Sequence, residues 1–156
     1  MLIKFFKFAL ILLFYQSPLY SKSKTLNDFN SHHLSNYFSG IVAYENNDNS
    51  QALKFFKSSK SLIKQHDSYL ENYVYTLVLE GKVQQATSEI KQNLTEGNSN
   101  FFEAHLVLAL DSLKRKNYKK SKEHLQKSYE FINNDRLSLI IAETLKQYLY
   151  VFEKNK

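Results

Sequence analysis

The chain has 156 residues, of which 43% are hydrophobic, and this length suits a single domain with its own core. Only three Gly and one Pro are present, which disfavours an all-β fold with many tight turns and favours helices joined by short loops. The absence of Cys excludes disulfides, thiolate metal sites and cysteine nucleophiles. The charge of +6 comes almost entirely from Lys rather than from the Arg that nucleic-acid readers favour, so we expect no nucleic-acid partner.

The first 21 residues have the pattern of a secretory signal peptide. Lys4 and Lys7 supply the positive start, and the uncharged apolar run Phe8–Tyr15 has the length of a signal core but is too short to span a bilayer. We expect cleavage after about Ser21, which leaves no stable membrane span. An uncleaved anchor and an ordinary buried helix are the alternatives for this segment.

Residues 22–31 are polar and unpatterned, and they are interpreted as a flexible lead-in to a domain at 32–156. Apolar residues then recur at spacings of three and four over 32–46, which indicates a helix with one apolar side. Asn and Asp at 46–50 predict a turn, because Asn tolerates the left-handed conformation and Asp caps the following helix. A second helix is predicted at about 50–65.

The next two helices are predicted at about 68–80 and 83–96. Gly81 is the natural stop of the earlier one. The later one has a narrow apolar stripe and a polar back, so it is expected on the outside of the fold. Asn100, with Glu103 three residues later, resembles a capping box that begins another helix.

Helices at about 101–115 and 118–131 are predicted to precede a last helix at 136–153. The last helix is apolar on two sides, and a helix of this kind needs cover on both. Its apolar positions form one stripe of Leu137, Ile141, Leu145, Tyr148 and Phe152 and a second stripe of Leu139, Ala142 and Leu149.

A small residue recurs at a nearly fixed distance along the chain. Ala52, Ala86 and Ser121 are 34 and 35 positions apart. Each is followed one helical turn later by a large apolar residue, namely Phe56, Ile90 and Leu125. A period in this range indicates stacked helical hairpins, each of which buries its apolar side against a neighbour.

The repeat resembles the tetratricopeptide (TPR) motif, which has two antiparallel helices in about 34 residues. Three units fit, at about 33–66, 67–101 and 102–135, and the last helix resembles the first half of a fourth. The resemblance implies a right-handed superhelical stack, a TPR-like α-solenoid. The chain is similar to the N-terminal part of longer secreted bacterial TPR proteins of unassigned function, and its abrupt end suggests a truncated chain. Together with the leader, this implies a periplasmic or secreted location in a bacterial cell envelope.

The resemblance rests on particular positions of the motif. The small residue of the first helix is matched by Gly40 and Ala109 but not by Val74. The glycine of the turn is matched by Gly81, and the other two units have Asn47 and Lys116 there. The closing proline of the motif is absent, and Ser59, Asn93 and Ser128 stand where a second alanine is common.

The resemblance also implies a function, binding of a protein or peptide partner in the concave groove lined by the first helix of each unit. The groove positions carried over are Leu34, Tyr37, Ile41, Tyr44, Glu71, Tyr75, Val78, Leu106, Leu110, Leu113 and Lys114. The alternative is that several of them pack between units. The Lys/Asn clamp that some TPR domains use for a C-terminal carboxylate is missing apart from Asn72, because Tyr37, Ile41, Glu103 and Val107 occupy its other places.

No motif for catalysis, a metal or a cofactor is visible. The chain has five histidines, namely His32, His33, His66, His105 and His124. None of them has another possible metal ligand at the spacing that metal sites use. His105 is interpreted as a packing or rim residue. Asp111 is the one carboxylate within an apolar run, and it is either a functional acid or a residue facing solvent. We therefore expect no enzyme activity.

Two other functions remain as alternatives to groove binding. In the first alternative, a second copy of the chain covers residues 137–152 of the last helix, which makes the protein a self-associating structural element and a homo-oligomer. The basic run Lys114–Lys120 would suit an anionic surface, although a solvated loop is the simpler interpretation.

Overall fold

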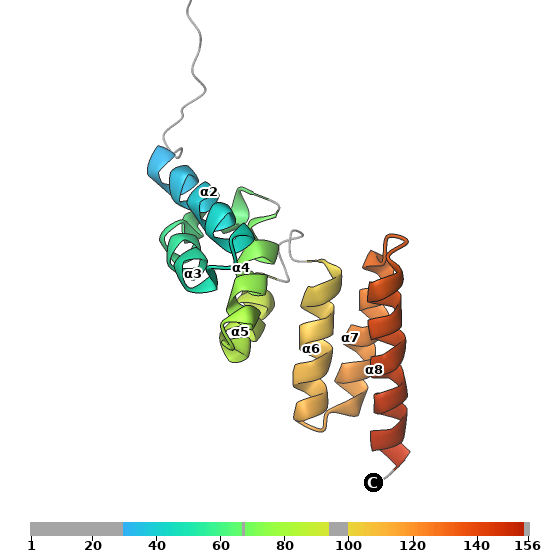
Figure 1. Ribbon diagram of the computed structural model, residues 1–156. Coiled ribbons are helices and arrows are strands. Elements are labelled where there is room, and N and C mark those ends of the chain that lie inside the picture. The colour runs from blue at the N-terminus through green and yellow to red at the C-terminus, as the bar shows by residue number, and fades with distance from the viewer. Residues whose placement is uncertain (1–29, 67, 94–99, 155–156) are drawn as a thin grey trace, which may run out of the picture. The chain divides into compact units, whose positions relative to one another are not determined.

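The computed structural model describes residues 30–66, 68–93 and 100–154. The predicted signal peptide and residues 22–29 of the lead-in lie outside these ranges and stay predictions. Throughout the described part of the chain, the regular elements are helices (Figure 1). They are α2 Ser31–Glu45, α3 Asn49–Ser58, η1 Lys60–Lys64, α4 Tyr69–Leu79, α5 Val83–Asn93, α6 Phe102–Lys114, α7 Tyr118–Ser128, η2 Tyr129–Phe131 and α8 Arg136–Lys154.

The helices pack as successive pairs. The contacts join α2 with α3, α4 with α5 and α6 with α7, and α8 packs on α7 and α6. Contacts between successive pairs gather Ser31–Lys156 into one unit. The predicted all-α stack of helix pairs is therefore confirmed.

The three turns within the pairs share one backbone conformation. Asn47, Gly81 and Lys116 have φ of 60°, 70° and 57°, the left-handed region. In each turn the next residue donates its N–H to a carbonyl five residues back, as Lys82 does to Leu77 at 2.8 Å. This is the Schellman end of a helix, which satisfies carbonyls that the helix leaves unpaired. The equivalence of these three positions, inferred from the sequence, is confirmed.

The recurring small residues lie where the two helices of each pair cross. Ala52, Ala86 and Ser121 are each 0% exposed. Ser121 Oγ donates a hydrogen bond to the Ala109 carbonyl of the facing helix at 2.7 Å. At Gly40 the approach is so close that a Cβ atom would lie 2.9 Å from the Phe56 ring. The small side chains therefore set the close approach of the helices, as the period predicts.

Two buried serines end the second helices of the outer pairs earlier than the sequence predicts. The predicted helix at 50–65 stops at Ser58 and continues as the 3₁₀ turn η1, and the one at 118–131 stops at Ser128 before η2. Ser59 Oγ donates to the Phe55 carbonyl at 2.9 Å, and Ser128 Oγ donates to the Leu125 carbonyl at 2.7 Å. A hydroxyl that binds a nearby backbone carbonyl competes with the helical ladder and favours a tighter turn.

The predicted capping box at α6 is wrong. The N-cap residue is Phe101, which has extended backbone and makes no side-chain cap hydrogen bond. Asn100 Oδ1 instead lies 3.3 Å from His105 Nε2, one turn into the helix. The Asn100 side chain therefore contacts the buried His105 imidazole and does not cap the N–H groups of the first turn.

The polar back predicted for the fourth helix is also partly wrong, because α5 buries Thr87 and Glu89. Glu89 Oε1 accepts a hydrogen bond from Lys60 Nζ at 2.7 Å. Lys60 is the first residue of η1, so the early end of α3 places this cation beside α5. An ion pair thus joins the first two helix pairs where the sequence indicated a solvated surface.

Candidate functional site

Tyr37 lies in the core, away from any surface that a partner could reach. Its side chain is 1% exposed, and its ring stacks on Tyr69 with centroids 5.5 Å apart. Asn72 Nδ2 donates to the Tyr37 hydroxyl at 3.2 Å. Burial raises the pKa of Tyr37 above its ordinary value. The groove role predicted for Tyr37 is therefore corrected: the ring fills the junction of the first two helix pairs, the alternative that the sequence left open.

The other groove positions of α2 are only partly available. Leu34, Ile41 and Tyr44 are half-buried and pack against the same core as Tyr37. The structure brings them to one side of α2, and their groove role stays a prediction.

Two of the three groove positions of α4, Glu71 and Tyr75, form a small acidic cluster with Glu103 of α6. The Tyr75 hydroxyl donates to Glu71 Oε1 at 3.4 Å, and Glu103 of α6 is a second hydrogen-bond neighbour of Tyr75. Burial, followed by the charge of Glu103, raises the pKa of Glu71, and burial with the two carboxylates raises the pKa of Tyr75. The third position, Val78, is exposed.

The groove positions of α6 gather around one cavity. Leu110, Leu113 and Lys114 line an open cavity of about 380 Å³ together with Lys116, Tyr118 and Phe152. We call it the α6–α8 cavity. Leu110, in the C-terminal half of α6, is 47% exposed. Leu106, the fourth predicted position, is half-buried and packs against the core beside this site. The sequence placed Phe152 in an apolar stripe of the last helix but did not assign it to the groove.

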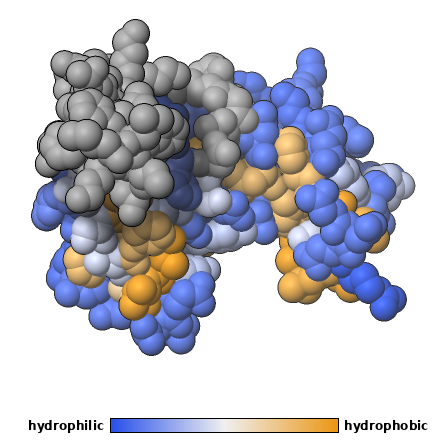
Figure 2. Space-filling model, turned by 90° about the horizontal axis from the view of Figure 1, so that it is seen from above, coloured by the Kyte–Doolittle hydropathy of each residue, from blue (hydrophilic) through white to orange (hydrophobic). Residues whose placement is uncertain are grey.

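A second cavity of about 440 Å³ lies between α5 and α6. It shares Leu110 and Lys114 with the α6–α8 cavity and adds Val83, Gln84, Thr87, Asp111 and Arg115. Figure 2 shows hydrophobic areas in orange on one face of the molecule, among largely blue, hydrophilic residues. Exposed apolar side chains with cationic neighbours thus border both sides of the C-terminal half of α6.

Asp111 holds α5 to α6 as the acid of an ion-pair network. Lys91 Nζ lies 3.2 Å from its Oδ2 and Arg115 Nε lies 3.1 Å from its Oδ1. Burial alone would raise the pKa of Asp111, but the hydrogen bonds from Arg115 and Lys91 hold it below its ordinary value. The carboxylate is thus charged and satisfied, which favours a positioning role over a reactive one. The same contact engages Arg115, while the rest of the basic run at 114–120 borders the α6–α8 cavity or solvent.

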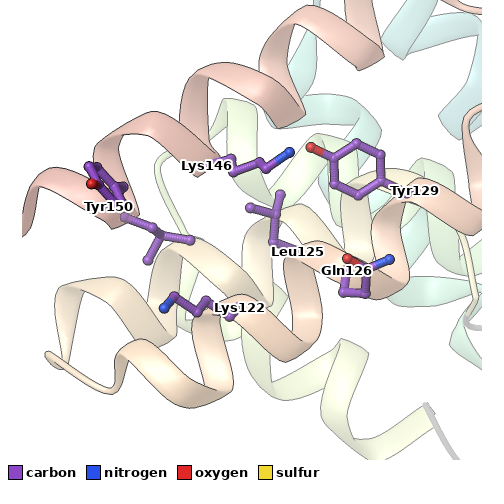
Figure 3. A pocket seen from close by; sticks show the side chains of 7 residues that line it. Lys122, Leu125, Gln126, Tyr129, Lys146 and Tyr150 are labelled. Atoms are coloured by element: carbon purple, nitrogen blue, oxygen red, sulfur yellow. The ribbon is translucent and has the colours of Figure 1, made fainter. Parts of the chain in front are cut away.

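Sequence reasoning missed a third cavity, of about 270 Å³, between α7 and α8. Leu125 and Leu149 form its apolar floor, and Lys122, Gln126, Tyr129, Lys146 and Tyr150 surround them (Figure 3). The cations are engaged within the chain, since Lys122 pairs with Glu153 and Lys146 with Glu143. Its signal in the sequence is weak, because most of its lining residues are polar or aromatic side chains outside the apolar positions that the repeat identifies.

The histidines lie in two different settings. His105 is buried in the third pair, with its ring 6.0 Å from His124 and stacked on Phe131 at 5.5 Å. This is the packing role that the sequence suggests. His33 Nδ1 lies 2.9 Å from the Ser58 carbonyl. Among the residues that the structure describes, no group of three or more His, Cys, Asp or Glu side chains is placed to hold a metal.

Within the same described ranges, no helix is long and apolar enough to cross a membrane.

Solved structures that resemble the chain include two TPR domains. The Arabidopsis OM64 TPR domain matches with a TM-score of 0.60 and 14% identity, over 76% of this chain and 97% of that one. The Sgt2 TPR domain from Aspergillus fumigatus matches with a TM-score of 0.60 and 18% identity, over 80% of this chain and 83% of that one. No protein-family model and no curated protein matches the chain. The chain therefore has the fold of TPR domains, and the TPR resemblance seen in the sequence is confirmed at the level of the fold.

Proposed function

We infer that the chain is a protein-interaction scaffold whose partner segment binds at the α6–α8 cavity. The observation that carries this proposal is the convergence of Leu110, Leu113 and Lys114 with Phe152 on one open cavity. Three of the four come from positions that the TPR resemblance assigns to the groove. The likeness of the fold to two TPR domains supports the same class of function.

The physical basis of the proposal is the burial of apolar surface on binding. Leu110 and Phe152 are each about half exposed, so a side chain inserted between them removes apolar area from water. Lys114 and Lys116 at the edge add cations that favour a partner with acidic or carbonyl groups beside its apolar anchor. Binding of this kind needs no bond making, so the proposed role is not enzymatic.

The proposal is tested by photo-crosslinking from inside the cavity. A photoreactive amino acid placed at position 110 of the full chain should capture a protein that the same residue at position 139 does not. Leu139 is the matched control, because it is an exposed leucine on α8 that lines none of the three cavities. The captured protein is then purified and titrated against Leu110→Glu, which should weaken binding at least about tenfold by placing a charge in the apolar site. Equal capture at both positions, or unchanged affinity of Leu110→Glu, would rule out the cavity as the binding site.

Export to the cell envelope is part of the same proposal and rests on the leader pattern of residues 1–21. The envelope fraction of cells that make the chain should contain a protein that begins at about Lys22. Leu12→Arg should keep the longer form inside the cell, because a charge interrupts the apolar core of the signal. N-terminal sequencing of each fraction measures this, and a protein that retains Met1 in the cytoplasm would refute it.

A further inference from the structure

The helix α8 has one covered side and one uncovered side. Ala142, Leu145 and Leu149 pack into the core with α6 and α7. The uncovered side is formed by Leu137, Ile140, Thr144 and Val151, which recur at spacings of three, four and seven and therefore share one face. We call it the free α8 face. Among the described residues, no helix packs over it.

The repeat identifies what occupies the equivalent face of the preceding pair. Adding 35 to Phe102, His105 and Ala109 of α6 gives Leu137, Ile140 and Thr144 of α8. In α6 these positions are covered by α7: Phe102 and Ala109 share a core with Leu125, the His105 ring lies beside His124, and Ala109 accepts the hydrogen bond from Ser121.

The difference in exposure between the two faces is large. Phe102 and His105 are 6% and 2% exposed, whereas Leu137 and Ile140 are 64% and 62% exposed. Monomeric proteins rarely leave a row of large apolar side chains this open unless another molecule covers it. The free α8 face is therefore a first helix of a pair that lacks its second helix within the described part of the chain.

The three second helices of this protein have a common pattern. Each of α3, α5 and α7 is amphipathic, with a fully buried small residue at the crossing and a large apolar residue four positions later. The small residue is required because the facing backbone approaches closely there, as the Ser121–Ala109 contact shows. A helix that covers the free α8 face must meet the same steric condition at Thr144.

Charge distinguishes between the possible occupants. Arg136 and Lys154 are 18 residues apart, which is five turns of an α-helix, so they lie on the same side at the two ends of α8. Arg136 precedes Ile140 by four and Lys154 follows Val151 by three, so both cations flank the free α8 face. The nearest acid on that flank, Glu143, is engaged by Tyr129 and Lys146.

These cations disfavour a second copy of the chain. Two α8 helices packed antiparallel through this face would bring Arg136 of one copy to Lys154 of the other, and like charges at an interface lower affinity. The α7 helix of a second copy is already buried in its own pair, and four of its eleven residues are Lys. An acidic helix, in contrast, is complementary to both flanking cations.

We propose that the free α8 face binds an amphipathic helix of another protein, with a small residue at the crossing, a large apolar residue four positions later and acidic residues along its flanks. The bound helix forms a fourth helix pair with α8. This surface is distinct from the α6–α8 cavity, so either assignment can fail without the other.

The test uses the full chain and synthetic fluorescent peptides of about 18 residues, five helical turns. The first peptide has Ala at the crossing, Leu four positions later and Glu on the flanks. The second has Lys in place of each Glu, and the third has Leu in place of the crossing Ala. Fluorescence anisotropy should show the first peptide binding at least about tenfold more tightly than the second or third.

Two matched variants locate the site. Ile140→Glu should weaken binding of the first peptide at least about tenfold, whereas Leu139→Glu should leave it within about twofold. Both are exposed apolar residues on α8, but one residue turns the helix by about 100°, so Leu139 points away from the free α8 face. Leu110→Glu should also leave this binding unchanged, which separates the result from the proposed function.

Several outcomes would overturn the proposal. Equal binding of the Ala and Leu crossing peptides would show that no close helix pair forms. Equal loss in Ile140→Glu and Leu139→Glu would show that another side of α8 is used. A dimer of the full chain in sedimentation velocity that Ile140→Glu dissociates would show that a second copy occupies the face.

Discussion

The first two helix pairs, α2–α5, and the last three helices, α6–α8, have cores of different residue composition. The core of α2–α5 is centred on large aromatic rings that are each no more than 1% exposed. Tyr37, Phe56 and Tyr69 contact one another, and Tyr73 contacts Tyr69. The buried residues of the α6–α8 core are Leu, Ala and Phe102, and its other aromatic residues, Tyr118, Tyr129 and Phe131, are only partly buried. The histidine pair lies beside this core.

The aromatic core is closed to solvent, because each ring is covered by another. Tyr69 also donates its hydroxyl to the Phe56 carbonyl, and burial raises the pKa of Tyr73 to about 12. The core of α6–α8 ends at a helix with one open side. We therefore expect α2–α5 to be the structural support of the protein and α6–α8 to be the part that binds partners.

The largest expected effect comes from removing an aromatic ring of the closed core. Phe56→Ala should lower the free energy of unfolding by about 3–5 kcal/mol, because the ring is fully buried and leaves a cavity. Phe152→Ala should change it by less than about 1 kcal/mol, because that ring is half exposed. Urea denaturation followed by circular dichroism measures both, and similar losses would contradict the contrast between the two regions.

A smaller effect is expected where the helices of the first pair meet. Gly40→Ala should cost about 1–3 kcal/mol, because the added Cβ would lie 2.9 Å from the Phe56 ring in a packed core. The α6–α7 pair has Ala109 at the equivalent position, so Ala109→Gly should cost only about 1 kcal/mol through backbone entropy. Thermal unfolding of the two variants compares them, and an unchanged melting temperature for Gly40→Ala would show that the first pair can separate.

The histidine pair should make α6–α8 the acid-sensitive part of the protein. Burial, followed by the neighbouring cations, lowers the pKa of His105 and His124 below the ordinary value of 6.5. The facing charges are Lys127, Glu123 and Lys120 of α7, Glu130 of η2 and Lys91 of α5.

The sign of the pH effect follows from these shifts. The unfolded chain binds protons more readily than the folded one, so this stability is complete above pH 6.5 and is lost as the pH falls toward the lowered values. Denaturation at pH 7.5 and pH 5.5 should show the loss in the wild type. His105→Gln combined with His124→Gln should reduce the difference, and a pH dependence that persists unchanged would contradict the assignment.

The smallest effect is a gain in stability at the turn between α6 and α7. Lys116 has a left-handed backbone with φ of 57°, which costs a side chain with a Cβ roughly 1 kcal/mol relative to Gly. Lys116→Gly should therefore raise the melting temperature, whereas the reverse change Gly81→Lys should lower it by a similar amount. Differential scanning calorimetry of the two variants tests this, and opposite signs from those expected would show that the two turns are not equivalent.

Local chemistry explains the parts of the fold that were predictable. Asn47 and Gly81 tolerate a positive φ, and small residues allow close helix packing wherever they occur, so both signals can be identified without knowing the neighbours. The burial of Tyr37 could not be read in this way. The position of Tyr37 in the apolar pattern suits a groove equally well. The residue is buried because Tyr69 and Asn72 of the next pair pack against it.

The sequence by itself determined the class of helices, the period of the pairs and the places of the three turns within the pairs, because each depends on residues within one turn or one crossing. The tertiary structure decided that the covered side of α8 combines Leu145 of one predicted stripe with Ala142 and Leu149 of the other. It also decided which acids pair with Lys60 and Lys91, and which groove positions remain open. Those outcomes depend on residues that lie 20 to 35 positions apart in the chain, for example Lys91 with Asp111 and Tyr37 with Asn72. A repeating pattern sets the spacing of such residues but leaves the angle at which one pair meets the next to packing.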